Sequence, residues 1–239
     1  MKILSPSITC ILTTHMKPTL GEALKSVTEQ TRRDAQVIVA DSGAWHGGAD
    51  RTSREIAYLY RTYKDHPMIE WVFTGERPGA SLSTCMVAKV FNDVLASGMV
   101  RGRYLCTFYD DDLYLPTFFE RMAGYLDEHQ DCQAVRCSER WVTRDASGTE
   151  RYLKTLAADR VLTPLDQFDC VVDGMQVMMR TEAVLKLTQP IIPEDVDSCR
   201  HSDGLFFERL KTVIPQMDAL NEELCVHRFT PHSTFTPVS

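Results

Sequence analysis

The sequence predicts an α/β protein with a mostly parallel central sheet that is covered by helices on both faces. Two observations carry this prediction. Short apolar runs alternate with helical patterns over the first 130 residues, and polar or acidic residues close several of these runs. Repeated strand–helix units of this kind imply right-handed crossovers between parallel strands. After about residue 130 the alternation weakens, and shorter β-like runs predict a smaller antiparallel part.

The individual elements follow from the spacing of the apolar residues. Strands are predicted at 8–13, 36–40, 69–73 and 103–109 in the first half, and at 134–137, 140–142 and 176–179 in the second. Helices are predicted near 18–30, 53–63, 82–96, 116–129 and 203–213. The tail from His227 onward is rich in Pro, Thr and Ser and predicts little regular structure. The chain shows no internal repeat and no linker, so we expect a single domain over residues 1–239.

The composition is that of a globular protein. The chain has 239 residues, 44% of them hydrophobic and 25% charged, with a formal net charge of -7. This charge disfavours a nonspecific nucleic-acid binder, and no apolar run approaches the roughly 18–20 residues that cross a bilayer. The eight cysteines include no C-x-x-C pair, so buried free thiols are expected rather than disulfides or a zinc site at Cys132 and Cys137. A cytoplasmic protein is the resulting expectation.

The strongest functional signal is a run of three aspartates, Asp110, Asp111 and Asp112, directly after the apolar strand 103–109. Open parallel sheets bind ligands beyond the carboxyl ends of their strands. Two carboxylates about 5 Å apart repel by roughly 3 kcal/mol at an effective dielectric of about 20, and a hard cation such as Mg²⁺ or Mn²⁺ removes that cost. A solvated turn that caps the next helix would explain one aspartate better than three. The run therefore favours a metal or ligand site.

Further polar residues follow the other predicted strands. Asp41 closes the second strand and could accept a hydrogen bond from a base or a ribose, or form an Asx-turn. Thr13, His15 and Arg77 could contact a nucleotide, although capping or solvation explains each of them as well. Asp203 opens an apolar-faced helix, where an N-cap is the simpler interpretation. The chain lacks the G-x-G-x-x-G and Walker motifs, so a nucleotide would be held differently from that in dehydrogenases and P-loop ATPases.

The order of these motifs resembles the inverting family-2 glycosyltransferases of the GT-A fold. SITCILTTHMKPTLGEALKSVTEQT resembles that family's first strand, polar turn and first helix, and VIVADSG resembles its second strand end. GASLSTCMVAKVFNDVLASGMVRGRYLCTFYDDDLYLP resembles the donor-binding helix, the following strand and the Asp-rich (DXD) motif. RHSDGLFFERL resembles the helix that carries the catalytic base, and HRFTPHSTF resembles the closing segment. The likeness covers 7–130 well and thins beyond.

The resemblance implies a single GT-A domain, with a nucleotide-sugar-binding half over 1–112 and an acceptor-binding half, with the antiparallel strands, over 113–239. It implies that a sugar passes from a UDP- or dTDP-sugar to an acceptor hydroxyl with inversion, and that Mn²⁺ or Mg²⁺ is the cofactor. The implied site residues are Thr13, His15, Asp41, Arg77 and Asp110 for the donor, Asp111 and Asp112 for the metal, and Asp203 as the general base.

Three positions depart from the family pattern. Ala40 replaces the first acid of the usual pair, and His15 stands where many relatives have an aromatic residue. Tyr109 stands where many relatives begin a longer acidic motif, which leaves open which aspartate of 110–112 holds the metal. The preferred nucleotide is left open too.

Two other classes of protein also remain open at this point. A sugar nucleotidyltransferase would share the α/β layout and an acidic metal site, but it normally needs a Gly-rich, lysine-bearing loop that this sequence lacks. A catalytically degenerate GT-A domain could instead bind a partner, with the aspartates as a solvated face. The sequence does not distinguish the acceptor, and it does not decide whether the chain forms homo-oligomers.

Overall fold

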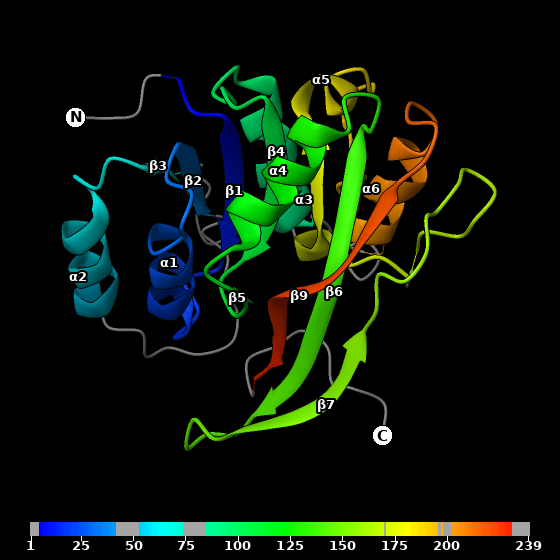
Figure 1. Cartoon of the computed structure of the whole chain (residues 1–239). Helices are drawn as coiled ribbons and strands as arrows, with labels where there is room; N and C mark the ends of the chain where they lie inside the picture. The colour runs from blue at the N-terminus through cyan, green and yellow to red at the C-terminus, as the bar shows by residue number, and fades with distance from the viewer. Residues whose placement is uncertain are drawn as a thin grey trace.

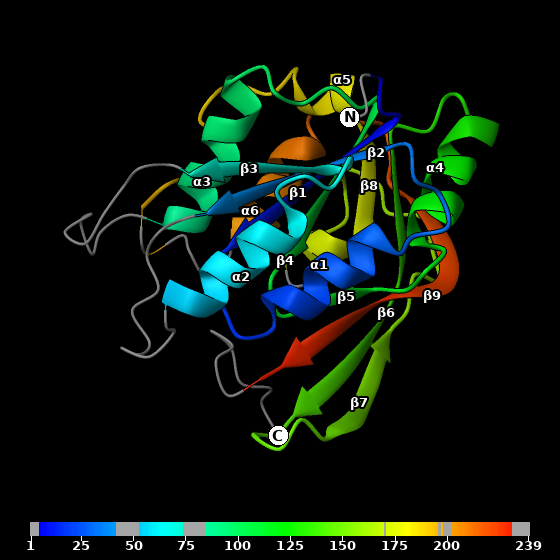
Figure 2. The same ribbon diagram turned by 90° about the vertical axis from the view of Figure 1, so that its left-hand side faces the viewer.

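A computed structural model describes residues 5–41, 53–73, 85–169, 171–195, 197 and 202–230 of the chain. Over these residues the strands form one nine-stranded sheet in the order β3-β2-β1-β4-β8-β6-β9-β5, and β7 pairs with β6 off this path. Helices pack on both faces of the parallel part of this sheet (Figures 1 and 2). The predicted fold class is confirmed.

The strands are β1 (Ile8–Thr14), β2 (Ala35–Asp41), β3 (Ile69–Phe73), β4 (Tyr104–Tyr109), β5 (Leu113–Tyr114), β6 (Ala134–Arg144), β7 (Glu150–Leu156), β8 (Val177–Arg180) and β9 (Asp218–Phe229). The helices are α1 (Leu20–Thr28), α2 (Ser53–Tyr63), α3 (Met86–Ala96), α4 (Phe118–Glu128), α5 (Thr181–Val184) and α6 (Ser202–Leu210), with a 3-10 turn η1 (Gly174–Gln176) before β8.

The first half of the chain builds the parallel part of the sheet. β1 lies between β2 and β4 and is parallel to both, and β3 is parallel to β2 at the edge. All seven residues of β1 are buried, as expected for a parallel strand with both faces covered. Ile8, Cys10 and Leu12 belong to the core under α1, α2 and α4, and Ile11 belongs to the core under α3, α5 and α6. Figure 2 shows α1 and α2 on one side of these strands and α3 on the other.

The second half of the chain continues the same sheet with antiparallel strands. β8 is antiparallel to both β4 and β6, and β7 is antiparallel to β6. β9 returns parallel to β6 and is antiparallel to the short β5 that follows the aspartates. The long strands β6, β7 and β9 extend beyond the body of the molecule (Figure 1). The antiparallel part is therefore joined to the parallel part rather than packed against it.

Several predicted boundaries differ from the structure. The two strands predicted at 134–137 and 140–142 are one strand, β6, and the helix predicted over 203–213 ends at Leu210. The start of the predicted helix 82–96 lies outside the described residues, which resume before Met86. β5, β7 and β9 were not predicted, and residues 227–229, expected to be irregular, end β9. The seven residues of β7 are mostly exposed and carry no apolar alternation, so only their pairing with β6 makes them a strand.

The six described cysteines are buried free thiols, as predicted, at positions Cys10, Cys85, Cys106, Cys132, Cys137 and Cys225. Among the described helices, none combines the length and the apolar character that crossing a membrane would require.

Candidate active site at the carboxyl edge of the sheet

The predicted donor-site residues meet where the parallel strands end. In the sheet register, Thr14 at the end of β1 lies opposite Asp41 at the end of β2, and Thr13 lies opposite Tyr109 at the end of β4. The three aspartates follow Tyr109 and form a turn before β5, which we call the aspartate turn (110–112). The structure thus brings Thr13, Asp41 and the aspartate turn to one edge of the sheet. Arg77 lies outside the described residues.

The aspartate turn points into the protein. Asp110, Asp111 and Asp112 are only 2%, 7% and 1% exposed, so a solvated helix-capping turn does not describe them. Asp110 Oδ2 accepts hydrogen bonds from Thr14 Oγ1 at 2.7 Å and from the backbone N–H groups of His15 and Lys17 at 3.0 Å each. These three bonds hold the loop that leaves β1, in which Met16 has a φ of 60°. Asp110 therefore shapes the loop that carries His15.

Asp111 is paired with a lysine. Its Oδ2 lies 2.7 Å from Lys17 Nζ, which also lies 3.7 Å from Asp110 Oδ1, and both side chains are nearly buried. Burial alone would lower the pKa of Lys17, but the charges of Asp111 and Asp110 outweigh it, so the pKa is raised. The ammonium group therefore stays charged and occupies one oxygen of Asp111.

Asp112 has one carboxylate oxygen without a hydrogen-bond partner among the described residues. Its Oδ1 accepts the backbone N–H of Arg228 in β9 at 2.9 Å. Its Oδ2 is buried and has no hydrogen-bond partner among the described residues. Burial raises the pKa of Asp112, against the effect of the neighbouring His227. Of the two predicted metal ligands, Asp112 is thus the one with a free buried oxygen.

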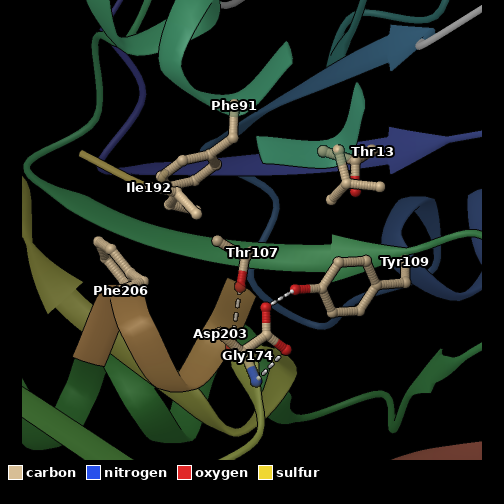
Figure 3. A pocket seen from close by; sticks show the side chains of 9 residues that line it. Thr13, Phe91, Thr107, Tyr109, Gly174, Ile192, Asp203 and Phe206 are labelled. Carbon is tan, nitrogen blue, oxygen red and sulfur yellow. Dashed lines mark hydrogen bonds between the residues drawn. The ribbon is translucent and has the colours of Figure 1, made fainter. Parts of the chain in front are cut away.

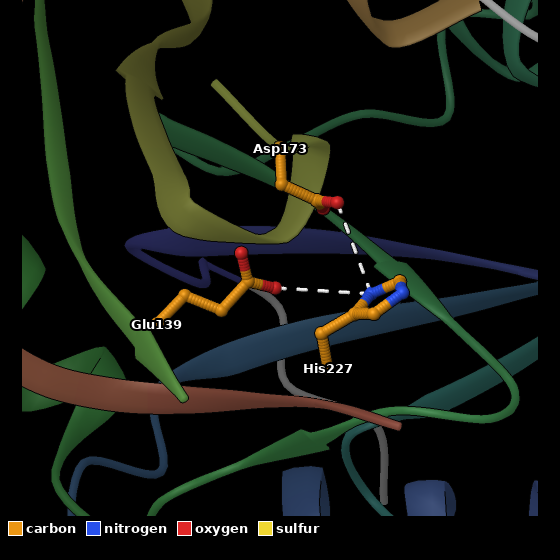
Figure 4. Close-up of side chains that lie close together, drawn as sticks. All are labelled: Glu139, Asp173 and His227. Carbon is orange, nitrogen blue, oxygen red and sulfur yellow. Dashed lines mark ion pairs between the residues drawn. The ribbon is translucent and has the colours of Figure 1, made fainter. Parts of the chain in front are cut away.

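Three residues from distant parts of the chain lie beside Asp112. His227 Nδ1 is 3.5 Å from Asp112 Oδ1, 3.8 Å from Glu139 Oε1 and 3.8 Å from Asp173 Oδ2. Figure 4 shows Glu139 from β6 and Asp173, which precedes η1, directed at the ring of His227 from β9. We call Asp112, Glu139, Asp173 and His227 the buried cluster. Sequence reasoning missed its last three members, because each stands alone in its segment and nothing in the local pattern marks it.

Burial changes the titration of the buried cluster. Burial, followed by the charge of Asp173, raises the pKa of Glu139 well above its usual range. Burial raises the pKa of Asp173 as well. Burial by itself would lower the pKa of His227, but the surrounding carboxylates outweigh it and hold that pKa well above its usual range.

Asp203, the predicted general base, is held at the same edge by two donors. The Tyr109 hydroxyl donates to Asp203 Oδ1 at 2.5 Å across 94 residues of sequence, and the Gly174 N–H donates to Oδ2 at 3.2 Å (Figure 3). A Cβ at position 174 would lie 2.7 Å from the Tyr109 hydroxyl and 3.0 Å from Asp203 Oδ2, so the approach requires glycine. Burial and then the charge of Asp173 raise the pKa of Asp203 to about 6.

A small cavity lies beside this carboxylate, between β1, β4, α3 and α6. Its volume is about 10 Å³, roughly the space that one water molecule needs. The hydroxyl of Thr13 is buried and has no hydrogen-bond partner among the described residues. The cavity is lined by Thr13, Val87, Phe91, Thr107, Tyr109, Gly174, Ile192, Asp203 and Phe206 (Figure 3). Thr13 and Asp203, predicted separately, therefore line one space.

His15 lies at this edge as a neutral ring. It is half-buried, and burial lowers its pKa even though the charge of Asp110 acts in the opposite direction. A neutral imidazole offers a flat face and one donor and one acceptor nitrogen. A ring with these properties can stack on a nucleobase and form hydrogen bonds with it.

Comparison with known proteins identifies structures that share this fold. The sequence matches no protein-family model and no curated protein. The structure, in contrast, is similar to residues 1–349 of S. aureus TarS in complex with UDP-GlcNAc, with a TM-score of 0.65, 15% identity and 93% of this chain covered. The same TarS fragment in complex with UDP gives a TM-score of 0.65, 16% identity and 94% coverage.

A second similar structure is the mannosyltransferase PcManGT from Pyrobaculum calidifontis in complex with GDP-Man and Mn²⁺. It gives a TM-score of 0.60 and 17% identity over 93% of this chain. The present chain spans only 58%, 61% and 57% of the length of these three chains. At this level of identity the likeness defines the fold, and the chain has the GT-A fold.

Proposed function

We propose that this chain is a glycosyltransferase that moves a sugar from a nucleoside diphosphate sugar to an acceptor hydroxyl, with inversion at the anomeric carbon. The observation that carries the proposal is the placement of Asp203 beside Tyr109, directly next to the aspartate turn. The GT-A fold supports it, because chains of this fold have been crystallised with UDP, UDP-GlcNAc and GDP-Man.

Inversion needs a group that takes the proton of the attacking hydroxyl on the side opposite the leaving diphosphate. Asp203 has the properties of such a base, since its carboxylate is fixed by two donors and its pKa of about 6 lies close to neutral. A water-sized cavity adjoins this carboxylate. Asp203 would therefore accept the proton as the new glycosidic bond forms.

The donor would lie along the ends of β1, β2 and β4. Thr13, His15 and Asp41 would contact the nucleoside, with Arg77 as a further contact. Asp110 would act through the loop that it holds, because its Oδ2 already accepts three hydrogen bonds. The acceptor would approach from the half of the chain over 113–239.

The residues present fit a divalent cation. Asp112 Oδ2 is a buried carboxylate oxygen without a partner among the described residues, and such an oxygen costs free energy unless a donor or a cation meets it. Asp111, the other metal ligand that the resemblance implies, is already paired with Lys17. When bound, Mn²⁺ or Mg²⁺ would neutralise the charge that develops on the leaving diphosphate.

Thermal unfolding with nucleotides tests the proposal. A nucleoside diphosphate with Mn²⁺, at about 100 times its dissociation constant, stabilises the folded state by roughly 2.7 kcal/mol. We expect such a shift in Tm with UDP, dTDP or GDP, none with the free nucleosides, and release of nucleoside diphosphate from at least one sugar nucleotide. A protein that shifts with no nucleoside diphosphate would instead be a GT-A domain that binds a partner.

A further inference from the structure

We propose that Asp112, Glu139, Asp173 and His227 together form the divalent-cation site of this chain. The inference deepens the proposed function, on which it rests for the role of the ion, by naming a ligand set of which only Asp112 lies in the aspartate turn. It also separates Asp112 from Asp110 and Asp111, whose oxygens other groups engage.

The spacing of the ligand atoms matches an ion. Ligand atoms of Glu139, Asp173 and His227 all lie within 4.8 Å of one another, and Asp112 adjoins them through its Oδ1, 3.5 Å from His227 Nδ1. An octahedral ion with bonds of about 2.1 Å places neighbouring ligands about 3.0 Å apart and opposite ligands about 4.2 Å apart. The distances of 3.8 Å from His227 Nδ1 to Glu139 Oε1 and to Asp173 Oδ2 fall between these two values.

Unpartnered atoms point to a missing ligand. Glu139 is fully buried, and its Oε1, 3.8 Å from His227 Nδ1, has no hydrogen-bond partner among the described residues. Asp112 Oδ2 and His227 Nδ1 are also buried and unpartnered there. Native proteins rarely leave buried polar atoms unsatisfied. A cation between Glu139 Oε1 and His227 Nδ1 would satisfy both of these atoms, and Asp112 beside them offers a further unpartnered oxygen.

Each carboxylate of the buried cluster is already oriented through its second oxygen. Glu139 Oε2 accepts from Trp141 Nε1 at 3.0 Å, and Asp173 Oδ1 accepts from the Met175 N–H at 3.1 Å. Asp112 Oδ1 accepts from the Arg228 N–H. Metal ligands in proteins are typically held by such outer contacts, which orient one oxygen toward the ion.

The donor set indicates the ion. Three carboxylates with one imidazole suit Mn²⁺, because carboxylates favour hard cations while a nitrogen ligand is accepted less readily by Mg²⁺. Four protein ligands also suffice to hold the ion before any diphosphate arrives. Binding of Mn²⁺ without nucleotide is therefore the distinguishing expectation.

The test measures Mn²⁺ binding to the full chain without nucleotide, by calorimetric titration and by the loss of the free Mn²⁺ signal in electron paramagnetic resonance. We expect one ion per chain. Glu139→Gln, Asp173→Asn and His227→Gln should each weaken binding at least about 10-fold. The exposed control Asp131→Asn should bind Mn²⁺ as the wild type does.

Several results would overturn the proposed ligand set. Binding that requires UDP, or that Glu139→Gln leaves intact while Asp111→Asn abolishes it, would place the ion elsewhere at the aspartate turn. Either result would leave the proposed sugar transfer standing, whereas absence of any nucleoside diphosphate binding would contradict that function instead.

A stability measurement excludes misfolding of the variants. Glu139→Gln removes a buried charge and keeps an oxygen that can accept from Trp141 Nε1, so the metal-free Tm should stay at or above that of the wild type. The increase in Tm on adding Mn²⁺ should be lost in the same variant. A lower metal-free Tm together with an unchanged Mn²⁺ response would show that Glu139 has a purely structural role.

Discussion

At the scale of single residues, the site depends on contacts between side chains that are far apart in sequence. Asp203 lies in the first turn of α6, and by sequence a helix N-cap was the simpler interpretation of it. In the structure its two oxygens accept hydrogen bonds from Tyr109 and Gly174 instead. Tyr109, which departs from the family pattern, thereby acquires a positioning role.

The first prediction concerns the general base. Asp203→Asn should lower kcat by about 10²–10⁴-fold, because the amide cannot take up the proton of the acceptor. The dissociation constant for the donor should change little, since Asp203 would contact the acceptor rather than the nucleotide. Steady-state kinetics together with titration of UDP measure both effects, and unchanged turnover would remove Asp203 from this role.

The second prediction concerns pH. Asp203 acts as a base only when it is ionised, so kcat/KM should fall about tenfold per pH unit below its pKa of about 6. The Tyr109 hydroxyl stabilises the ionised form, and Tyr109→Phe should therefore raise the pKa and move this acid limb to higher pH. A limb at the same pH in both proteins would contradict the assignment.

At the scale of elements, the aspartate turn connects segments that lie far apart in the sequence. Asp110 and Asp111 bind the loop between β1 and α1, and Asp112 binds the backbone of β9. The short β5 then pairs with β9. The turn is thus held from both halves of the chain, which explains why it points inward.

The third prediction concerns Lys17. Lys17→Met leaves the nearly buried Asp110 and Asp111 without their cation and should destabilise the fold by about 3 kcal/mol. Adding Asp111→Asn should recover part of this loss, because the two residues are coupled. Urea unfolding measures both variants.

The matched control for that prediction is Lys25→Met in α1. Lys25 forms an exposed pair with Glu29 one turn away, so the loss should stay near 0.5 kcal/mol or less. Equal losses for the two lysines would show that the Lys17 pair contributes no more than a surface pair.

At the scale of the whole molecule, one sheet runs through both halves of the chain. β4 of the first half pairs with β8 of the second, and the core under α1 also includes residues of α4 and β9. A division near residue 112 would separate β4 from β8, its hydrogen-bonded neighbour in this sheet. The two halves of the chain are therefore parts of one structural unit.

The fourth prediction follows from this continuity. Calorimetric unfolding of the full chain should show a single cooperative transition, with equal calorimetric and van't Hoff enthalpies. A fragment of residues 1–112 should not fold alone, since it lacks the strand that covers the edge of β4. Two separate transitions would show that the halves are independent domains.

The sequence by itself determined the parallel half of the sheet and which polar residues lie at its carboxyl edge. Continuous apolar runs such as Ile8–Thr14 mark buried parallel strands, and strand ends mark where ligands bind. These signals are local, because the side chains that report them lie within a few residues of one another. Thr13, His15, Asp41 and the aspartate turn could be found in this way.

Only the tertiary structure decided the rest. The exposed β7 and the partly polar β9 are strands because β6 pairs with them. The residues of one segment do not indicate which distant strand it will pair with. Glu139, Asp173 and His227 form a cluster because β6, η1 and β9 converge on Asp112. The pKa of such a side chain depends on its neighbours and on its loss of water, and both are set by contacts between residues more than fifty positions apart in the sequence.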